Sequence, residues 1–88
     1  MTRSADRARL LIKQIGPKKL SVLSGTDHSR WLNVSKGAVR VSSEELDVLV
    51  QLYPQYALWL ASGEIIPEKG QTSPAHDAHD AQAADPAE

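Results

Sequence analysis

The 88-residue sequence contains no cysteine, which excludes disulfides and thiolate metal sites. It has no long apolar run and no secretory or membrane-spanning pattern, so a soluble cytoplasmic protein is expected. It also lacks a strand pattern and an internal repeat. A chain of this length has room for one hydrophobic core, which predicts a single small domain.

The end of the chain is poor in apolar residues. Residues 71–88 contain no large apolar side chain. Such a segment buries too little surface to offset the entropy lost when a chain becomes ordered. We therefore expect a folded domain over residues 1–70 and a disordered acidic tail over residues 71–88.

The net charge of -1 conceals an uneven distribution. Residues 1–70 hold all ten Lys and Arg side chains and have a net charge of +3, whereas residues 71–88 have a net charge of -4. A mildly basic domain with an acidic tail is compatible with nucleic-acid binding, although the basic excess is small.

Glycine and proline divide residues 4–63 into five helical stretches. Apolar residues recur three or four positions apart within them, as on the inner face of a helix. Ser42 and Glu45 form a capping-box pattern, and Pro17 suits the first position of a helix. The expected helix caps are Ser4, Asp27 and Ser42, and the expected core residues include Leu20, Leu23 and Trp31. The sequence thus predicts an all-α bundle of about five short helices.

Residues 20–37 are the most informative segment. One helix is expected to end at Gly25, a tight turn follows, and the next helix begins at Asp27 with polar side chains along its first turn. This layout is typical of a helix-turn-helix, in which the second helix lies in a DNA major groove.

Several short motifs in residues 17–64 match one known family in order and spacing. They are Leu20-Ser21, Gly25, Trp31, Gly37, Ser42 with Leu46, Ala57-Leu58-Trp59-Leu60 and Gly63-Glu64. The segment resembles the lambda-repressor-like helix-turn-helix family, which includes Cro-type, repressor-type and XRE-like regulators, and the match needs no insertion or deletion. The resemblance implies a DNA-binding transcriptional regulator of phage or bacterial type.

The resemblance also implies which side chains read DNA bases. They are Asp27, His28, Ser29 and Asn33 of the third helix, with Arg30 lying between them. Asn pairs with adenine, His and Ser bond to base edges, and Arg reaches guanine or a phosphate. The alternative is that these residues only solvate the outer face of a helix.

Four basic residues are expected to contact DNA phosphates. They are Lys18, Lys19, Lys36 and Arg40. The first two lie at a helix N-terminus, where backbone N–H groups favour an anion, and the other two flank the end of the third helix. The alternative is that they are ordinary solvent-exposed cations.

Catalytic and metal-binding chemistry have little support. Asp27, His28 and Ser29 are the residue types of a hydrolytic triad, but adjacent helical side chains diverge by about 100°. His76 and His79 have no third fixed ligand with which to hold a metal. We expect no enzyme activity, no metal, no cofactor and no small-molecule ligand.

The fifth helical stretch is apolar on more sides than a small domain can cover. The expected dimer-interface residues are Leu58, Trp59, Ile65 and Ile66. The resembling family often dimerises in this region. The alternative is a monomer in which Ile65 and Ile66 fold back over the helix.

The leading hypothesis is a Cro-like, phage-type transcriptional regulator that binds double-stranded DNA through its third helix as a homodimer. The alternative is a protein-interaction module that has the same fold, binds another regulator and no longer reads DNA. Pro17 stands where the family usually has Gln, and this departure, with the weak net charge, keeps the alternative open.

Overall fold

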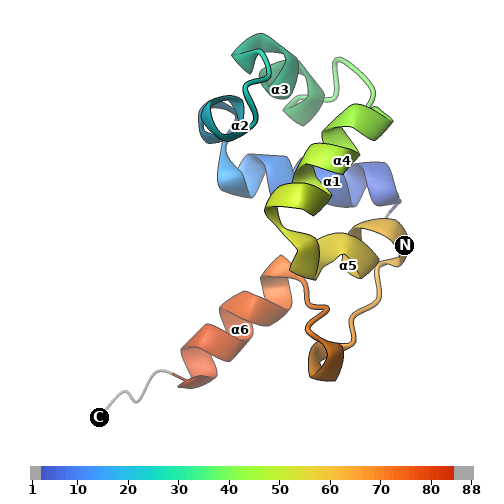
Figure 1. Ribbon diagram of the computed structural model, residues 1–88, viewed down its shortest axis with the longest axis vertical. Coiled ribbons are helices and arrows are strands. Elements are labelled where there is room, and N and C mark those ends of the chain that lie inside the picture. Colours follow the sequence, from blue (N-terminus) through green and yellow to red (C-terminus); the bar gives the residue numbers. More distant parts are fainter. Residues whose placement is uncertain (1–2, 85–88) are drawn as a thin grey trace.

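The structure is a computed structural model of the chain and describes residues 3–84, with side chains described over residues 3–79. In this range the chain forms six α-helices and two 3₁₀ turns, and no strand (Figure 1). The elements are α1 (Ser4–Ile15), α2 (Pro17–Ser24), α3 (His28–Ser35), α4 (Ser43–Leu52), η1 (Pro54–Tyr56), α5 (Ala57–Ser62), η2 (Pro67–Lys69) and α6 (Pro74–Ala84). The predicted all-α class is confirmed, and α6 is a helix beyond the expected five.

The central helix is α1, which packs against α2, α3 and α5. Its inner face follows the helical repeat, because each turn brings an apolar side chain back to the same side. The buried core consists of Ala8, Leu11, Ile12, Leu20, Trp31, Val34, Leu49, Tyr56 and Leu60. The prediction that Leu23 belongs to this core is wrong, since its side chain is 49% exposed. Ser24 takes the inward position instead, where it bonds to the indole of Trp31.

Two of the three expected caps are confirmed. Asp27 precedes α3, and Ser42 caps α4 with a complete capping box to Glu45. The third expectation is wrong by one residue: Arg3 is the N-cap of α1 and Ser4 is the first helical residue. The cause is Asp6, whose carboxylate accepts the backbone N–H of Arg3 at 3.3 Å and so begins the helix there.

A buried arginine ties the first and last helices of the core together. Arg7 is only 7% exposed, and its Nε donates to the carbonyl of Leu60 at 3.3 Å. Gly63 ends α5 in the left-handed region, with φ of 82°, and a Cβ there would lie 3.3 Å from Nη1 of Arg7. Position 63 therefore favours glycine for two reasons: the backbone has a positive φ, and a side chain would crowd Arg7.

The expectation of a disordered tail from residue 71 is wrong for residues 71–84. The backbone N–H of Thr72 donates to the carbonyl of Gln55 at 2.8 Å, and Ser73 is buried. The hydroxyl of Tyr56 donates to the carboxylate of Asp77 at 2.8 Å, which attaches α6 to η1. Residues 85–88, which share the same expectation, lie outside the described residues.

Residues 71–84 are held by polar contacts, which a pattern of apolar residues does not reveal. Gln71 accepts the N–H of Leu58 at 2.9 Å and donates to the carbonyl of Pro54 at 3.2 Å. The hydroxyl of Ser73 accepts the N–H of His76, and Pro74 follows at the first helical position. Serine at the N-cap followed by proline is a known signal for the start of a helix, and Ser73-Pro74 provides this signal in the sequence.

We predict that a chain ending at Gly70 is less stable than the full chain by about 1–3 kcal/mol, since it loses several hydrogen bonds that each contribute about 0.5–1.5 kcal/mol. The measurement is urea unfolding followed by circular dichroism. A chain ending at His79 is the control, because it keeps the contacts of Gln71, Thr72 and Asp77. Equal stability of all three chains would show that these contacts contribute nothing.

Candidate nucleic-acid interface

Helices α2 and α3 are joined by a three-residue turn over residues 25–27. Gly25 adopts a left-handed conformation, with φ of 74°, and donates its N–H to the carbonyl of Ser21 at 2.9 Å. The hydroxyl of Ser24 accepts the N–H of Thr26 at 3.1 Å. The turn thus satisfies the last groups of α2 locally and lets α3 begin at once, which completes a helix-turn-helix pair.

The rotation of α3 about its axis is set by Trp31. The indole is fully buried, and its Nε1 donates to the hydroxyl of Ser24 at 3.2 Å. That hydroxyl donates in turn to the carbonyl of Leu20 at 2.6 Å. Because the largest side chain of α3 points inward with its polar atom bonded, the opposite side of α3 must face solvent.

The outward side of α3 carries a polar stripe of Ser29, Asn33 and Lys36. All three are exposed, and their spacing of four and three residues places them within about 60° of arc. Within the described residues nothing hydrogen-bonds to these side chains. A row of exposed donors and acceptors without internal partners is suited to binding an external polar surface.

Three further residues of the region have distinct positions. His28 is exposed in the first turn of α3, and Asp27 is exposed at the N-cap, ahead of the stripe. Leu32 is half-buried and lies between His28 and Lys36 at the helical spacing. Leu32 was not expected in the site because it is apolar, although an apolar side chain at such a position can contact a thymine methyl group.

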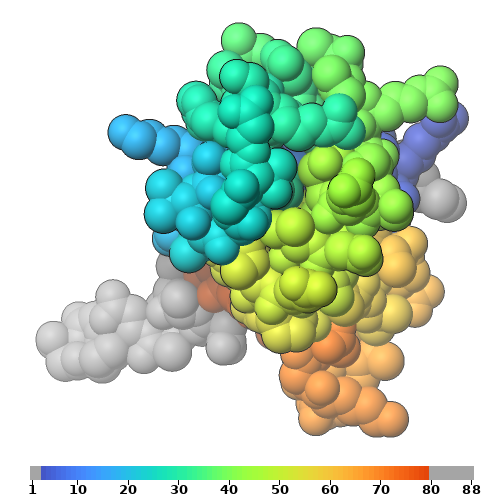
Figure 2. Space-filling model, turned by 45° about the horizontal axis from the view of Figure 1, so that its top comes forward, coloured from blue at the N-terminus to red at the C-terminus, as the bar shows by residue number. Residues whose placement is uncertain are grey.

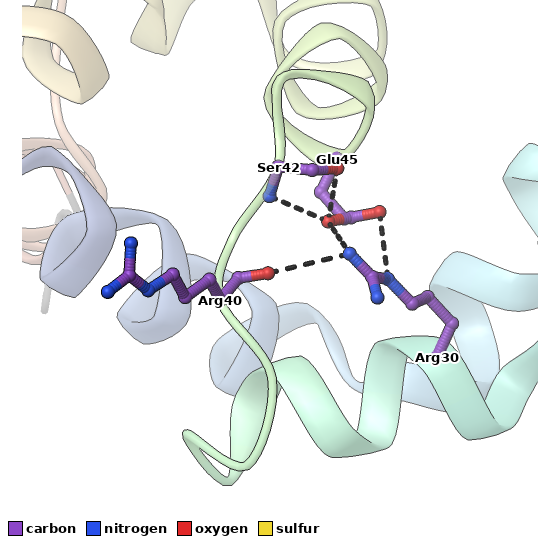
Figure 3. Close-up of polar contacts among 4 residues, drawn as sticks. All are labelled: Arg30, Arg40, Ser42 and Glu45. Carbon is purple, nitrogen blue, oxygen red and sulfur yellow. Dashed lines mark hydrogen bonds and ion pairs between the residues drawn. The ribbon is translucent and has the colours of Figure 1, made fainter.

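The expected base contact of Arg30 is not supported by its geometry. Its Nε donates to Oε2 of Glu45 at 3.2 Å, and its Nη2 donates to Oε1 at 3.0 Å (Figure 3). The same Nη2 lies 3.5 Å from the carbonyl oxygen of Arg40. The guanidinium is engaged on the α4 side of α3, where it braces the two helices, and its expected base contact stays a prediction.

The pair with Arg30 is part of a small polar network around Glu45. This carboxylate is 5% exposed and also accepts the N–H and the hydroxyl of Ser42, at 2.8 and 2.7 Å. Burial alone would raise the pKa of Glu45, but the hydrogen bonds from Arg30 and Ser42 outweigh it and hold the pKa below its usual value. The sequence signal was the capping box, which revealed Ser42 but not Arg30.

The expected phosphate-binding residues lie around both ends of the helix pair. Lys18 and Lys19 are exposed in the first turn of α2, and Lys36 is exposed at the C-cap of α3. Arg40 is exposed in the following loop, and its side chain extends toward α1 (Figure 3). Figure 2 shows α2 and α3 side by side at one end of the molecule, with the loop that follows α3 beyond them.

An acidic hollow limits the direction from which a polyanion can approach. A cavity of about 400 Å³ beside α3 is lined by Glu44, Glu45 and Asp47 of α4, together with Arg30 and Trp31. Phosphates are repelled from this side because one guanidinium faces three carboxylates. The polar stripe on the outward side of α3 has no such obstacle.

The described residues contain no group of three His, Asp or Glu side chains placed to hold a metal ion. His76 and His79 both lie on α6, outside the helix pair. No helix in the described part of the chain is long and apolar enough to cross a membrane.

The chain matches neither a known family profile nor a curated protein. It is similar to a solved structure, that of Pf6r from the filamentous phage Pf6 of Pseudomonas aeruginosa PA01, with 45% identity and a TM-score of 0.79. The match covers 85% of this chain and 99% of the Pf6r chain. The chain belongs to the Pf6r family. A filamentous phage therefore encodes a member of its family, in agreement with the phage-type protein predicted from the sequence.

We predict that Glu45→Gln lowers the free energy of unfolding at pH 7 by about 1–3 kcal/mol, because charge-assisted hydrogen bonds to a buried carboxylate are lost. A lowered pKa in the folded state means that the charge stabilises the fold above pH 4.5, the usual pKa, and that this contribution is lost as the pH falls through the folded value. Wild type should thus lose stability more steeply below pH 4.5 than the variant. Urea unfolding across pH measures this, with the exposed Glu44→Gln as control. If the stability of wild type and of Glu45→Gln fell in parallel with pH, Glu45 would not be the group whose charge stabilises the fold.

Proposed function

We propose that this Pf6r-family protein is a phage-type transcriptional regulator that binds duplex DNA sequence-specifically through α3. The observation that carries the proposal is the polar stripe of Ser29, Asn33 and Lys36, which is exposed and lies opposite the buried Trp31. A helix of eight residues is about 12 Å long, comparable with the width of the major groove.

The proposal divides the interface into base-reading and phosphate-holding groups. Asn33 is suited to adenine, while Ser29 and His28 bond to base edges and Asp27 accepts from a cytosine amino group. Lys18, Lys19, Lys36 and Arg40 bind the phosphate backbone, which supplies affinity but no sequence information.

We predict that Asn33→Ala and Ser29→Ala relax sequence preference, at a cost of about 1–3 kcal/mol at the base pair each one reads. Lys36→Ala should weaken binding to all duplexes alike, with a smaller salt dependence. The measurement is selection from a random duplex library, followed by fluorescence titration of the selected and random duplexes at two salt concentrations.

The matched controls are Gln51→Ala, which removes an exposed amide from α4, and Lys69→Ala, which removes an exposed cation from η2. Both should bind as wild type does. If Asn33→Ala and Ser29→Ala bind every duplex as wild type does, α3 is not the reading helix. If wild type binds no duplex in a salt-dependent way, the fold serves protein interaction instead.

We further propose that the protein acts as a homodimer formed around α5. Ile65 and Ile66 are 36% and 37% exposed in the segment between α5 and η2, and Gln71, which follows η2, bonds to the N–H of Leu58 on α5. Leu58 and Trp59 are half-buried on α5 itself. An apolar hollow of about 340 Å³ beside α5 is lined by Ser4, Leu46, Val50, Ala57, Leu60 and Ala61. These surfaces support a self-association site, and a two-fold dimer would set two recognition helices about 34 Å apart.

We predict that Ile65→Glu and Leu58→Glu shift the protein from dimer to monomer, because a carboxylate in an apolar interface must be desolvated. Sedimentation equilibrium at micromolar concentrations measures the shift. Leu10→Glu is the control, since Leu10 is an apolar residue, 48% exposed on α1, that is not among the proposed interface residues. A wild-type protein that remains monomeric at high micromolar concentration, free and on DNA, would refute the dimer.

A further inference from the structure

A basic hollow lies between the start of α1 and the loop that follows α3. Its volume is about 380 Å³, and it is lined by Arg3, Ala5, Asp6, Arg9, Arg40 and Val41. Three guanidinium groups thus share the hollow with a single carboxylate. Such a site attracts an anion with several acceptor oxygens, because each guanidinium can donate two parallel hydrogen bonds.

One of the three arginines that line the hollow, Arg9, is incompletely satisfied. Nε of Arg9 is buried and has no hydrogen-bond partner among the described residues. Its Nη1 lies 3.5 Å from a carboxylate oxygen of Asp6, a long contact to a side chain that is 55% exposed. An exposed ion pair of this kind contributes little stability, so an incoming anion competes with Asp6 at low cost.

The hollow begins where the polar stripe of α3 ends. Lys36 is the last residue of the stripe, and a Cβ on the next residue, Gly37, would lie 4.0 Å from Nε of Arg9. Arg40 enters from the same loop, and its side chain extends toward α1 (Figure 3). A DNA strand that follows the stripe past Lys36 therefore meets these arginines next.

We infer that this hollow binds a phosphate of the DNA backbone, which makes Arg3 and Arg9 phosphate ligands together with Arg40. The inference rests on the proposed DNA binding and extends its footprint from the helix pair to α1. Tetrahedral phosphate fits the site because it offers acceptor oxygens in several directions, as three separate guanidinium groups require. Asp6 then limits the affinity, since its charge opposes the phosphate.

The first test removes the cations one at a time from the full chain. Arg9→Gln and Arg3→Gln should each reduce the slope of log affinity against log salt by about 1 on a random duplex, because one phosphate contact releases about one counterion. Arg3 is exposed, so its variant remains informative if Arg9→Gln does not fold. Lys69→Gln, which makes the same charge change on η2, should keep the wild-type slope.

The second test removes the competing carboxylate. Asp6→Asn should bind the random duplex more tightly than wild type at low salt, and a gain of affinity cannot arise from unfolding. Glu68→Gln makes the same charge change on η2 and should leave affinity unchanged. Equal gains for Asp6→Asn and Glu68→Gln would reveal a general charge effect and overturn the inference.

Inorganic phosphate separates a DNA site from a site for a free anion. If phosphate raises the melting temperature of wild type but not of Arg9→Gln, while both bind duplex with the same slope, the hollow is a free-anion site and the inference is wrong. If wild type binds no duplex, the proposed function and the inference fail together. If Asn33→Ala and Lys36→Ala alter DNA binding while Arg3→Gln and Arg9→Gln do not, only the inference fails.

Discussion

The bracing of α3 against α4 by Arg30 and Glu45 is the interaction on which the interface depends. Glu45 is buried; its Oε2 accepts from Arg30 and its Oε1 accepts from both Arg30 and Ser42, so one carboxylate caps α4 and holds α3. Arg30 also approaches the carbonyl of Arg40 at 3.5 Å, which constrains the loop between the two helices (Figure 3). Arg30 holds the backbone of Arg40 on one side of the loop, and the side chain of Arg40 extends on the other side, toward α1. Leaving the buried carboxylate of Glu45 without a partner would cost far more free energy than an exposed ion pair contributes. Conformations of the loop that separate Arg30 from Glu45 are therefore strongly disfavoured.

Most of the fold was predictable from the sequence, because its helix boundaries are set by local chemistry. Glycine at Gly25 and Gly63 adopts the left-handed conformation that ends a helix, and Pro17 begins one without losing a bond. These signals act within a few residues and do not depend on tertiary contacts. Leu23 and α6 were mispredicted for the opposite reason. The hydrogen bond between Ser24 and Trp31 determines which side of α2 is buried. Contacts with Gln55 and Tyr56 hold residues 71–84 against the rest of the domain.

The candidate site was predictable only where its residues share one helix. Ser29, Asn33 and Lys36 follow from helical spacing once Trp31 is placed inside. In the sequence Arg30 looks like its polar neighbours, and only its ion pair with Glu45 shows that it braces α3 against α4. Arg3 and Arg9 carried no signal at all, because their relation to Arg40 is created by the packing of α1 against α3 and not by proximity in the chain.

The net charge of -1 is unevenly distributed along the sequence, since residues 1–70 carry +3. The chain measures 42 Å along its longest axis, and α3 and α6 lie toward opposite ends of it (Figure 1). Screening at physiological salt acts over about 8 Å, so charges at one end have little effect at the other. The carboxylate of Asp77 is moreover engaged by Tyr56, where burial and this hydrogen bond raise the pKa of the phenol to about 12. Because Tyr56 anchors Asp77 at the far end of the molecule, this carboxylate does not offset the charge of the cations near α3, so the proposed binding of a phosphate backbone depends on the local excess of Lys and Arg.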